Sequence, residues 1–220
     1  MNRWGLWVLW MLASMQGWAQ VPDAGAWLGY SARYKPAKKW ELEVAPEVRI
    51  NQNYAQIHRL LADVSLTYSP LKRLDLSVAY RFSWRNQTYF WDVRNRFFVD
   101  AKFNQSVHKK IDLTYRARYQ YQFTDLALNN ADDRSSDFIR HKASLKIDLP
   151  KKLTANVGAE YWQPLAPWLQ GVQNRRISAS LAWDQNKRHR WEIGLFEEKA
   201  LNTTRPATAY VLTFRHRQKF

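Results

Sequence analysis

The feature that most constrains this chain is an alternation of apolar and polar residues that continues for ten or more positions at a time. In residues 74–85 the even positions are apolar, from Leu74 to Trp84, whereas the odd positions are polar or small, from Asp75 to Arg85. Successive side chains of a β-strand point to opposite faces, so this pattern predicts a strand with one apolar and one charged face. No segment of the sequence has a helical period. We therefore predict an all-β fold.

Ten further segments alternate in the same way, and their lengths favour a membrane barrel over a soluble sandwich. These segments are 25–34, 40–50, 59–68, 91–103, 111–123, 138–149, 153–162, 175–184, 189–198 and 208–220. Strands of soluble proteins usually have about five or six residues. About eleven residues, tilted by roughly 40°, span roughly 25 Å, which is the apolar height of an outer-membrane barrel. Aromatic residues also gather at both ends of the apolar faces, as two membrane interfaces select. We predict a single antiparallel transmembrane β-barrel of about 10–12 strands.

The connections between these segments also alternate in kind. Short connections at 36–39, 70–73, 107–110, 150–152 and 186–188 all contain Lys or Arg, whereas longer ones occupy 124–137, 163–174 and 199–207. Short periplasmic turns and longer outer loops are typical of bacterial barrels. The basic residues either keep the turns soluble or contact anionic lipid headgroups. The apolar loop 163–174 is either a rigid connection, a plug, a partner contact or a membrane-surface contact.

The first nineteen residues have the pattern of a cleavable export signal. Arg3 precedes an apolar stretch over residues 4–15, and the small residues Gly17 and Ala19 stand where a signal peptidase requires them. We predict a signal peptide at 1–19 and a barrel domain at 20–220. Export argues against nucleic acid as the partner of a chain with a net charge of +15. The absence of Cys excludes thiol catalysis, and no metal-ligand spacing is present, so we predict no cofactor and no metal.

The C-terminal segment 210–220 alternates and ends in Phe220, which resembles the signal that the outer-membrane barrel-assembly machinery reads. Residues 23–27, 80–82, 95–97 and 115–119, together with the basic turns, resemble a family of Gram-negative outer-membrane barrels of unknown function. The resemblance covers nearly the whole mature chain. It implies a barrel in the cell outer membrane, in contact with its lipids and assembled by that machinery. It implies no reaction.

If the apolar faces contact lipid, the charged faces line the lumen. The expected basic lumen cluster is Arg81, Arg85, Arg94, Arg96, Arg116, Arg118, Arg140 and Lys142, and the expected acidic wall is Glu41, Glu43 and Glu47. A basic wall facing an acidic one selects anions in a wet pore, which predicts a narrow pore for small anionic solutes. The alternative is a plugged barrel with a structural or partner-binding role, in which side chains interlock across the lumen. The small lumen of such a barrel favours this alternative.

Matching the apolar residues across each hairpin predicts the strand registers. The expected apolar pairs are Tyr34–Trp40, Phe103–Ile111, Leu149–Leu153 and Trp183–Trp191. They set five opposite charges side by side: Arg33–Glu41, Lys102–Asp112, Lys142–Glu160, Asp184–Arg190 and Arg176–Glu198. The same matching sets Arg96 opposite Arg118, so the positive charges of the 91–123 hairpin are expected to have no acidic partners across the hairpin.

A third interpretation is an outer-membrane lipid-modifying enzyme. Such an enzyme needs a nucleophile with a base, and the sequence contains no G-x-S-x-G motif. His58, beside a loop, is the only plausible base, and a solvated loop histidine is the simpler explanation for it. We predict that the chain is not an enzyme.

Overall fold

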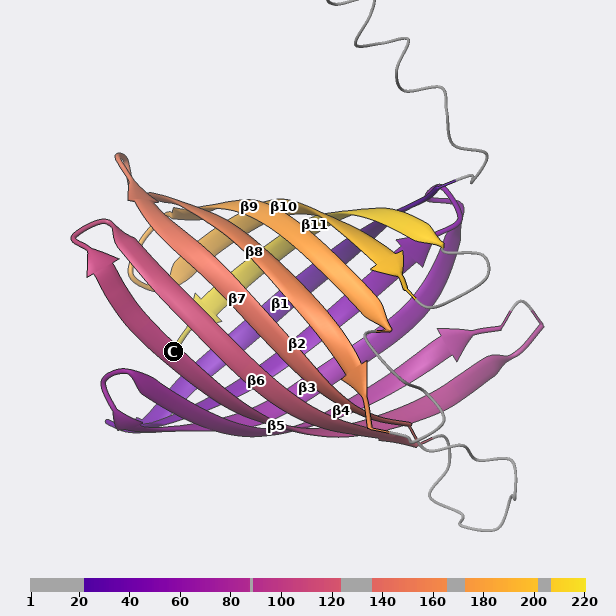
Figure 1. The fold of residues 1–220 in the computed structure, drawn as a ribbon, viewed down its shortest axis with the longest axis horizontal. Coiled ribbons are helices and arrows are strands. Elements are labelled where there is room, and N and C mark those ends of the chain that lie inside the picture. The colour runs from indigo at the N-terminus through magenta and orange to yellow at the C-terminus, as the bar shows by residue number, and fades with distance from the viewer. Residues whose placement is uncertain (1–21, 88, 124–135, 166–172, 202–206) are drawn as a thin grey trace, which may run out of the picture.

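The computed structural model describes residues 22–87, 89–123, 136–165, 173–201 and 207–220, which form one closed β-barrel (Figure 1). The predicted all-β barrel is therefore confirmed, with eleven strands. They are β1 (Asp23–Ala37), β2 (Trp40–Asn51), β3 (Gln56–Leu71), β4 (Leu74–Asn86), β5 (Trp91–His108), β6 (Ile111–Phe123), β7 (Ser136–Leu149), β8 (Leu153–Pro164), β9 (Asn174–Asp184), β10 (His189–Ala200) and β11 (Thr208–Lys219).

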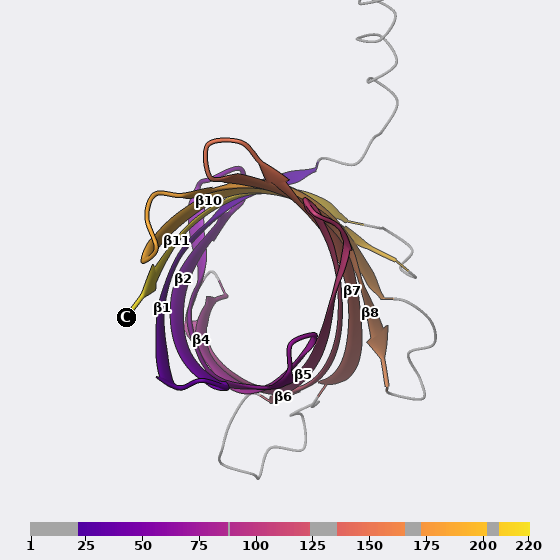
Figure 2. The same cartoon turned by 90° about the vertical axis from the view of Figure 1, so that its left-hand side faces the viewer.

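Strands that follow one another in the chain pair antiparallel, and the barrel closes where β1 meets β11. An odd number of strands makes the first and last run in the same direction, so this closing pair is parallel, from Asp23 opposite Ala209 to Arg33 opposite Lys219. The chain ends beside this closing pair, where the Phe220 amide donates a hydrogen bond to the Arg33 carbonyl at 2.9 Å. Figure 2 looks along the barrel and shows the closed ring.

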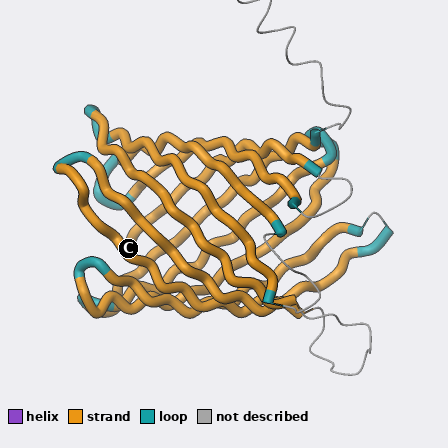
Figure 3. Tube along the Cα trace, viewed as in Figure 1, coloured by secondary structure: helices purple, strands orange, loops and turns teal. Residues whose placement is uncertain are grey.

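The two ends of the barrel differ in their connections, and Figure 3 shows the turns gathered at these ends. Short turns at 38–39, 72–73, 109–110, 150–152 and 185–188 lie at the end that carries the C-terminus, which we call the short-turn end. The opposite end, here the loop end, carries the turn at 52–55 and the segment around 87–90. Most of the three expected long loops, at 124–135, 166–172 and 202–206, lies outside the described residues. The expected signal peptide at 1–19 also lies outside them.

The alternation of each strand places apolar side chains outside the barrel and charged ones inside. Along β4, Val78 is 55% exposed, whereas its neighbour Ala79 is 7% exposed. The described residues include forty large apolar side chains that remain exposed, because no second layer covers the barrel. Aromatic contacts occur at both ends of this outer face, such as Trp40 with Tyr68, whose ring centroids lie 4.7 Å apart. Among the described residues, no helix is long and apolar enough to cross a membrane.

The predicted registers are right for two hairpins and wrong for two. Leu149 pairs with Leu153, and Trp183 pairs with Trp191, as expected. Tyr34 pairs with Leu42 instead of Trp40, and an irregularity follows Tyr34 before the turn.

The larger error concerns the β5–β6 hairpin. Phe103 pairs with Tyr115 instead of Ile111, because β5 continues to His108 and has an irregularity between Ser106 and His108. Lys102 therefore lies opposite Arg116, not Asp112, and forms its ion pair with Asp75 of β4 at 3.5 Å.

Candidate functional site

The lumen of the barrel contains a polar cavity of about 1310 Å³. Its lining runs from Lys72 and Asp112 at the short-turn end to Gln173 and Asn174 at the loop end. A second space of about 450 Å³ adjoins it near the short-turn end, between β1 and β6. Sixteen Lys or Arg residues and seven Asp or Glu residues line the larger cavity, so the wall carries an excess of positive charge.

All eight residues of the predicted basic cluster share the lumen face of four consecutive strands. Arg81 and Arg85 are on β4, Arg94 and Arg96 on β5, Arg116 and Arg118 on β6, and Arg140 and Lys142 on β7. Six of them line the larger cavity: Arg81, Arg96, Arg116, Arg118, Arg140 and Lys142. The strands thus bring these residues to one side of the lumen, although they divide into two groups with different partners.

The predicted pairing of Arg96 with Arg118 is wrong, because the β5–β6 register differs by four residues from the expected one. Arg118 lies opposite Asp100 and binds it through two hydrogen bonds, at 2.6 and 2.7 Å. Arg96 lies opposite Gln122 and donates to its side-chain oxygen at 2.6 Å. Arg118 is therefore neutralised on the wall, whereas Arg96 has only a neutral partner there.

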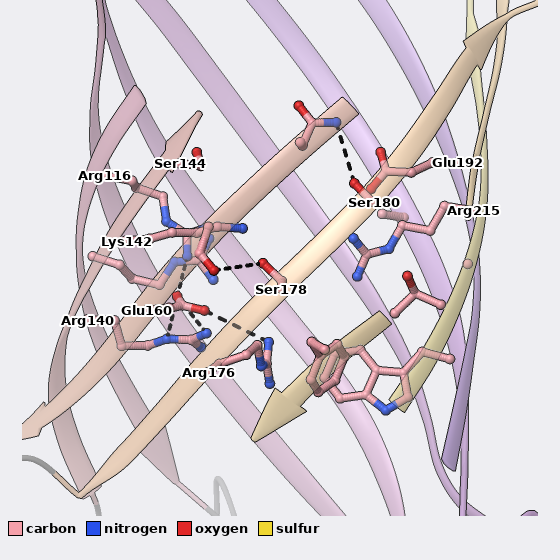
Figure 4. Close-up of a pocket in the computed structure, with 18 of the residues that line it drawn as sticks. Arg116, Arg140, Lys142, Ser144, Glu160, Arg176, Ser178, Ser180, Glu192 and Arg215 are labelled. Carbon is pink, nitrogen blue, oxygen red and sulfur yellow. Dashed lines mark hydrogen bonds and ion pairs between the residues drawn. The ribbon is translucent and has the colours of Figure 1, made fainter. Parts of the chain in front are cut away.

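The first group of cations, which consists of Arg116, Arg140 and Lys142, lies around Glu160 of β8, together with Arg176 (Figure 4). Its Oε1 accepts hydrogen bonds from Arg116 at 2.5 Å and from Arg140 at 2.9 Å, and Arg176 lies 3.9 Å from its Oε2. Lys142 is directly opposite Glu160 in the β7–β8 pairing, as the sequence predicts. Three arginines and Lys142 thus surround Glu160, which is itself 3% exposed, and among the described residues only Arg176 has a second carboxylate partner, Glu198, so this part of the wall stays positive.

The second group lies toward the loop end, and we call it the loop-end arginine group. It consists of Arg49, Arg59, Arg81, Arg85, Arg94 and Arg96, on the neighbouring strands β2 to β5. Three of its members have a carboxylate partner within 3 Å: Arg49 with Glu47, Arg81 with Asp63, and Arg94 with Asp92. For Arg59, Arg85 and Arg96, the described residues offer no carboxylate within ion-pair distance. Sequence analysis missed Arg49 and Arg59, although their positions in the alternation put them on the lumen face.

The predicted acidic wall is placed differently from expectation. Glu41, Glu43 and Glu47 do lie on the lumen face of β2, but arginines of β1, β2 and β11 neutralise them. Arg33 of β1 binds Glu41 at 3.0 Å and Glu43 at 2.8 Å. Glu47 binds Arg49 at 2.7 Å and also lies 3.4 Å from Arg215. These carboxylates therefore do not form a free acidic surface opposite the basic one.

Aromatic side chains inside the lumen are a feature that sequence analysis did not find. Trp27 and Phe196 meet edge to face at 4.7 Å, and the Arg176 guanidinium lies 4.2 Å from the Phe196 ring. Arg49 lies over Trp27 at 3.6 Å, and Arg140 over Trp162 at 4.3 Å. Such contacts hold guanidinium groups flat against the wall. The sequence signal that could have found these side chains is an apolar residue at a position where the alternation otherwise places polar residues.

Small side chains also face the lumen from β7 to β10, between the charged and aromatic ones. Ser144, Ser178 and Ser180 face the lumen there, together with Gly158 and Gly194. A Cβ at Gly194 would stand 2.8 Å from side-chain atoms of Ser180 and Thr213, so this close contact requires glycine.

Features of an enzyme or a metal protein are sparse in the described part of the chain. His58 lies near the loop end, on β3 next to Arg59. No group of three or more His, Asp or Glu residues within the described ranges is placed to hold a metal ion. The absence of enzymatic activity and of a cofactor stays a prediction.

Comparison with known proteins gives a family but no function. No curated protein matches the chain. The model of a family described as proteins of unknown function, DUF2490, matches residues 24–208. This match covers nine complete strands, all of β1 but its first residue and the first position of β11, which is most of the barrel. The chain therefore belongs to the DUF2490 family of proteins of unknown function.

Proposed function

We propose that this protein is an outer-membrane β-barrel that passes small anionic solutes through its lumen. The observation that carries the proposal is the polar cavity of about 1310 Å³, which reaches residues at both ends of the barrel and has sixteen basic residues against seven acidic ones. An excess of cations on the walls of a wet, narrow passage concentrates anions and repels cations.

The arrangement of the ion pairs supports a passage over a barrel plugged by its own wall. Side chains that interlock across a lumen would join strands on opposite sides of it. Every ion pair among the described residues instead joins positions on one strand or on strands at most two apart, such as Arg118 with Asp100 and Arg116 with Glu160. The wall neutralises part of its own charge without filling the space between its sides.

The outer surface supports insertion in a membrane. Forty large apolar side chains are exposed on the described residues, which is far more than a soluble monomer tolerates. In this proposal the outer face contacts outer-membrane lipids. The barrel-assembly machinery inserts the chain and recognises the last strand, which ends in Phe220. Both follow from the expected export signal and from the resemblance of the last strand to a barrel-assembly signal.

Osmotic swelling of vesicles tests the proposal. The full chain is folded into phospholipid vesicles, which are then diluted into anionic, neutral or cationic solutes of the same size. We expect swelling to be fastest with the anion. Membrane fractionation and the mass of the exported chain, which should begin at Gln20, test the location.

Vesicles that contain folded protein but do not swell would contradict the proposal and favour a plugged structural or partner-binding barrel. A lipid-modifying enzyme would be supported only by lipid turnover that His58→Ala abolishes.

A further inference from the structure

The loop-end arginine group places like charges directly side by side. Arg59 of β3 lies opposite Arg49 of β2 on one side and opposite Arg85 of β4 on the other. Arg81 of β4 lies opposite Arg96 of β5. Directly opposite residues of neighbouring strands have Cβ atoms about 4.5–5.5 Å apart, and like charges at that spacing repel. An arrangement of this kind destabilises the barrel unless something neutralises it.

The protein neutralises half of this group. Arg49, Arg81 and Arg94 form ion pairs with Glu47, Asp63 and Asp92, respectively. Arg59, Arg85 and Arg96 form no ion pair with a described residue. These three lie on three neighbouring strands. Their Nε atoms are buried without a hydrogen-bond partner among the described residues, a feature that they share with paired arginines such as Arg116 and Arg190. Burying a charge without an opposite charge is costly, so the feature that sets these three arginines apart is the lack of a carboxylate within ion-pair distance, not the unused Nε atom.

Glu160 shows what kind of acceptor such a set of arginines takes. In that part of the wall, one oxyanion sits among Arg116, Arg140 and Arg176 and accepts hydrogen bonds from the first two. Arg85 lies opposite Asp92, which is bound to Arg94, and within the described ranges no carboxylate lies within ion-pair distance of Arg59, Arg85 or Arg96. Because the lumen next to Arg59 and Arg96 is open cavity, an acceptor from solution can reach them.

From this difference we infer that Arg59, Arg85 and Arg96 form a binding site for a soluble oxyanion with two or more charges, of which a phosphoryl group is the best match. The inference rests on the proposed function, because it names the class of anion that the lumen selects. Planar guanidinium groups bind the oxygens of phosphate through paired hydrogen bonds, which a spherical chloride ion cannot form. Three excess cations also match a doubly charged anion better than a singly charged one.

Phosphate binding to the folded barrel is the direct test. The full chain is folded in dodecyl maltoside, a detergent without phosphate, and titrated calorimetrically with inorganic phosphate in a sodium chloride background. We expect saturable binding of one phosphate per chain. Arg59→Gln and Arg96→Gln should each weaken it by about tenfold or more, because each removes a charged hydrogen-bond donor.

Arg190→Gln is the matched control. Arg190 is also a lumen arginine, but it lies at the short-turn end and is paired with Asp184 at 3.0 Å. The Arg190→Gln variant should bind phosphate with the affinity of the wild type. Arg96→Lys keeps the charge and loses the planar fork, so it should show intermediate affinity even if the glutamine variant folds poorly. A heat-dependent gel shift verifies folding of each variant.

Bilayer recordings separate failure of this inference from failure of the proposed function. A conducting barrel whose chloride current is insensitive to phosphate, together with no calorimetric binding, would overturn the phosphoryl site and leave the anion passage standing. Phosphate binding in detergent by a barrel that does not conduct would support the site and contradict the passage. If Arg96→Gln and Arg190→Gln weaken phosphate binding equally, the binding depends only on the net charge of the lumen, and the inference is overturned.

Discussion

Removing the Glu160 carboxylate should destabilise the barrel more than any other single loss of an acidic residue from its wall. Glu160→Gln keeps the shape of the side chain and removes its charge. Arg116 and Arg140 would then lose their shared anion, Arg176 would keep only Glu198, and Lys142 would remain opposite the same position. The variant tests whether the wall depends on this single carboxylate.

The expected magnitude follows from burial and from the number of partners. Glu160 is 3% exposed and accepts hydrogen bonds from two arginines. Removing one partner from a buried ion pair costs about 3–5 kcal/mol. Arg116 and Arg176 are partly exposed to the lumen, where water screens their repulsion, so we expect the lower value, about 3 kcal/mol.

Urea unfolding in phospholipid vesicles, followed by tryptophan fluorescence and gel shift, measures this loss in the free energy of unfolding. Asp184→Asn is the matched control, because Asp184 is 41% exposed and has the single partner Arg190. An exposed pair contributes about 0.2–1 kcal/mol, so the control should lose no more than that. Equal stability losses in the two variants would refute the reasoning that Glu160 holds the cations together.

Four other substitutions test the arrangement of the wall by unfolding in the same vesicles. Arg118→Gln leaves Asp100 buried without its partner and should lower the free energy of unfolding by about 3 kcal/mol. Arg96→Gln removes the repulsion from Arg81 and should leave the stability equal or higher. The opposite order of the two stabilities would contradict the observed register. Gly194→Val should cost about 1–3 kcal/mol because its side chain would overlap atoms already 2.8 Å from a Cβ, and an unchanged stability would show that the wall yields there. Val99→Arg, on the outer face at the middle of β5, should cost about 2–4 kcal/mol if that face contacts hydrocarbon, and a neutral result would argue against membrane insertion.

The alternation in the sequence predicts which face of each strand is charged, and the structure agrees for all eight residues of the basic cluster. It does not predict which residues become neighbours, because a register shift of two or four residues leaves every side chain on the same face. The β5–β6 hairpin illustrates this, since its shift of four residues exchanges a predicted Arg96–Arg118 contact for the observed Arg118–Asp100 pair.

Turn geometry decides where such shifts occur. The β7–β8 and β9–β10 hairpins have no irregularity near their turns, and apolar matching finds their registers correctly. The β1–β2 and β5–β6 pairs have an irregularity next to the turn, which local alternation does not reveal. The uncompensated charge at Arg59, Arg85 and Arg96 depends on the registers of β2–β3, β3–β4 and β4–β5, which hairpin matching did not address, so sequence analysis did not locate it.

Ion selectivity of the reconstituted protein tests the central claim most directly. The folded chain is inserted into a planar bilayer between two potassium chloride solutions of different concentration, and the reversal potential of the current is measured. The excess of basic residues along the lumen predicts discrete conductance with a reversal potential of the sign that chloride permeation sets. A folded barrel that stays electrically silent, or one whose reversal potential has the sign of potassium permeation, would contradict the account.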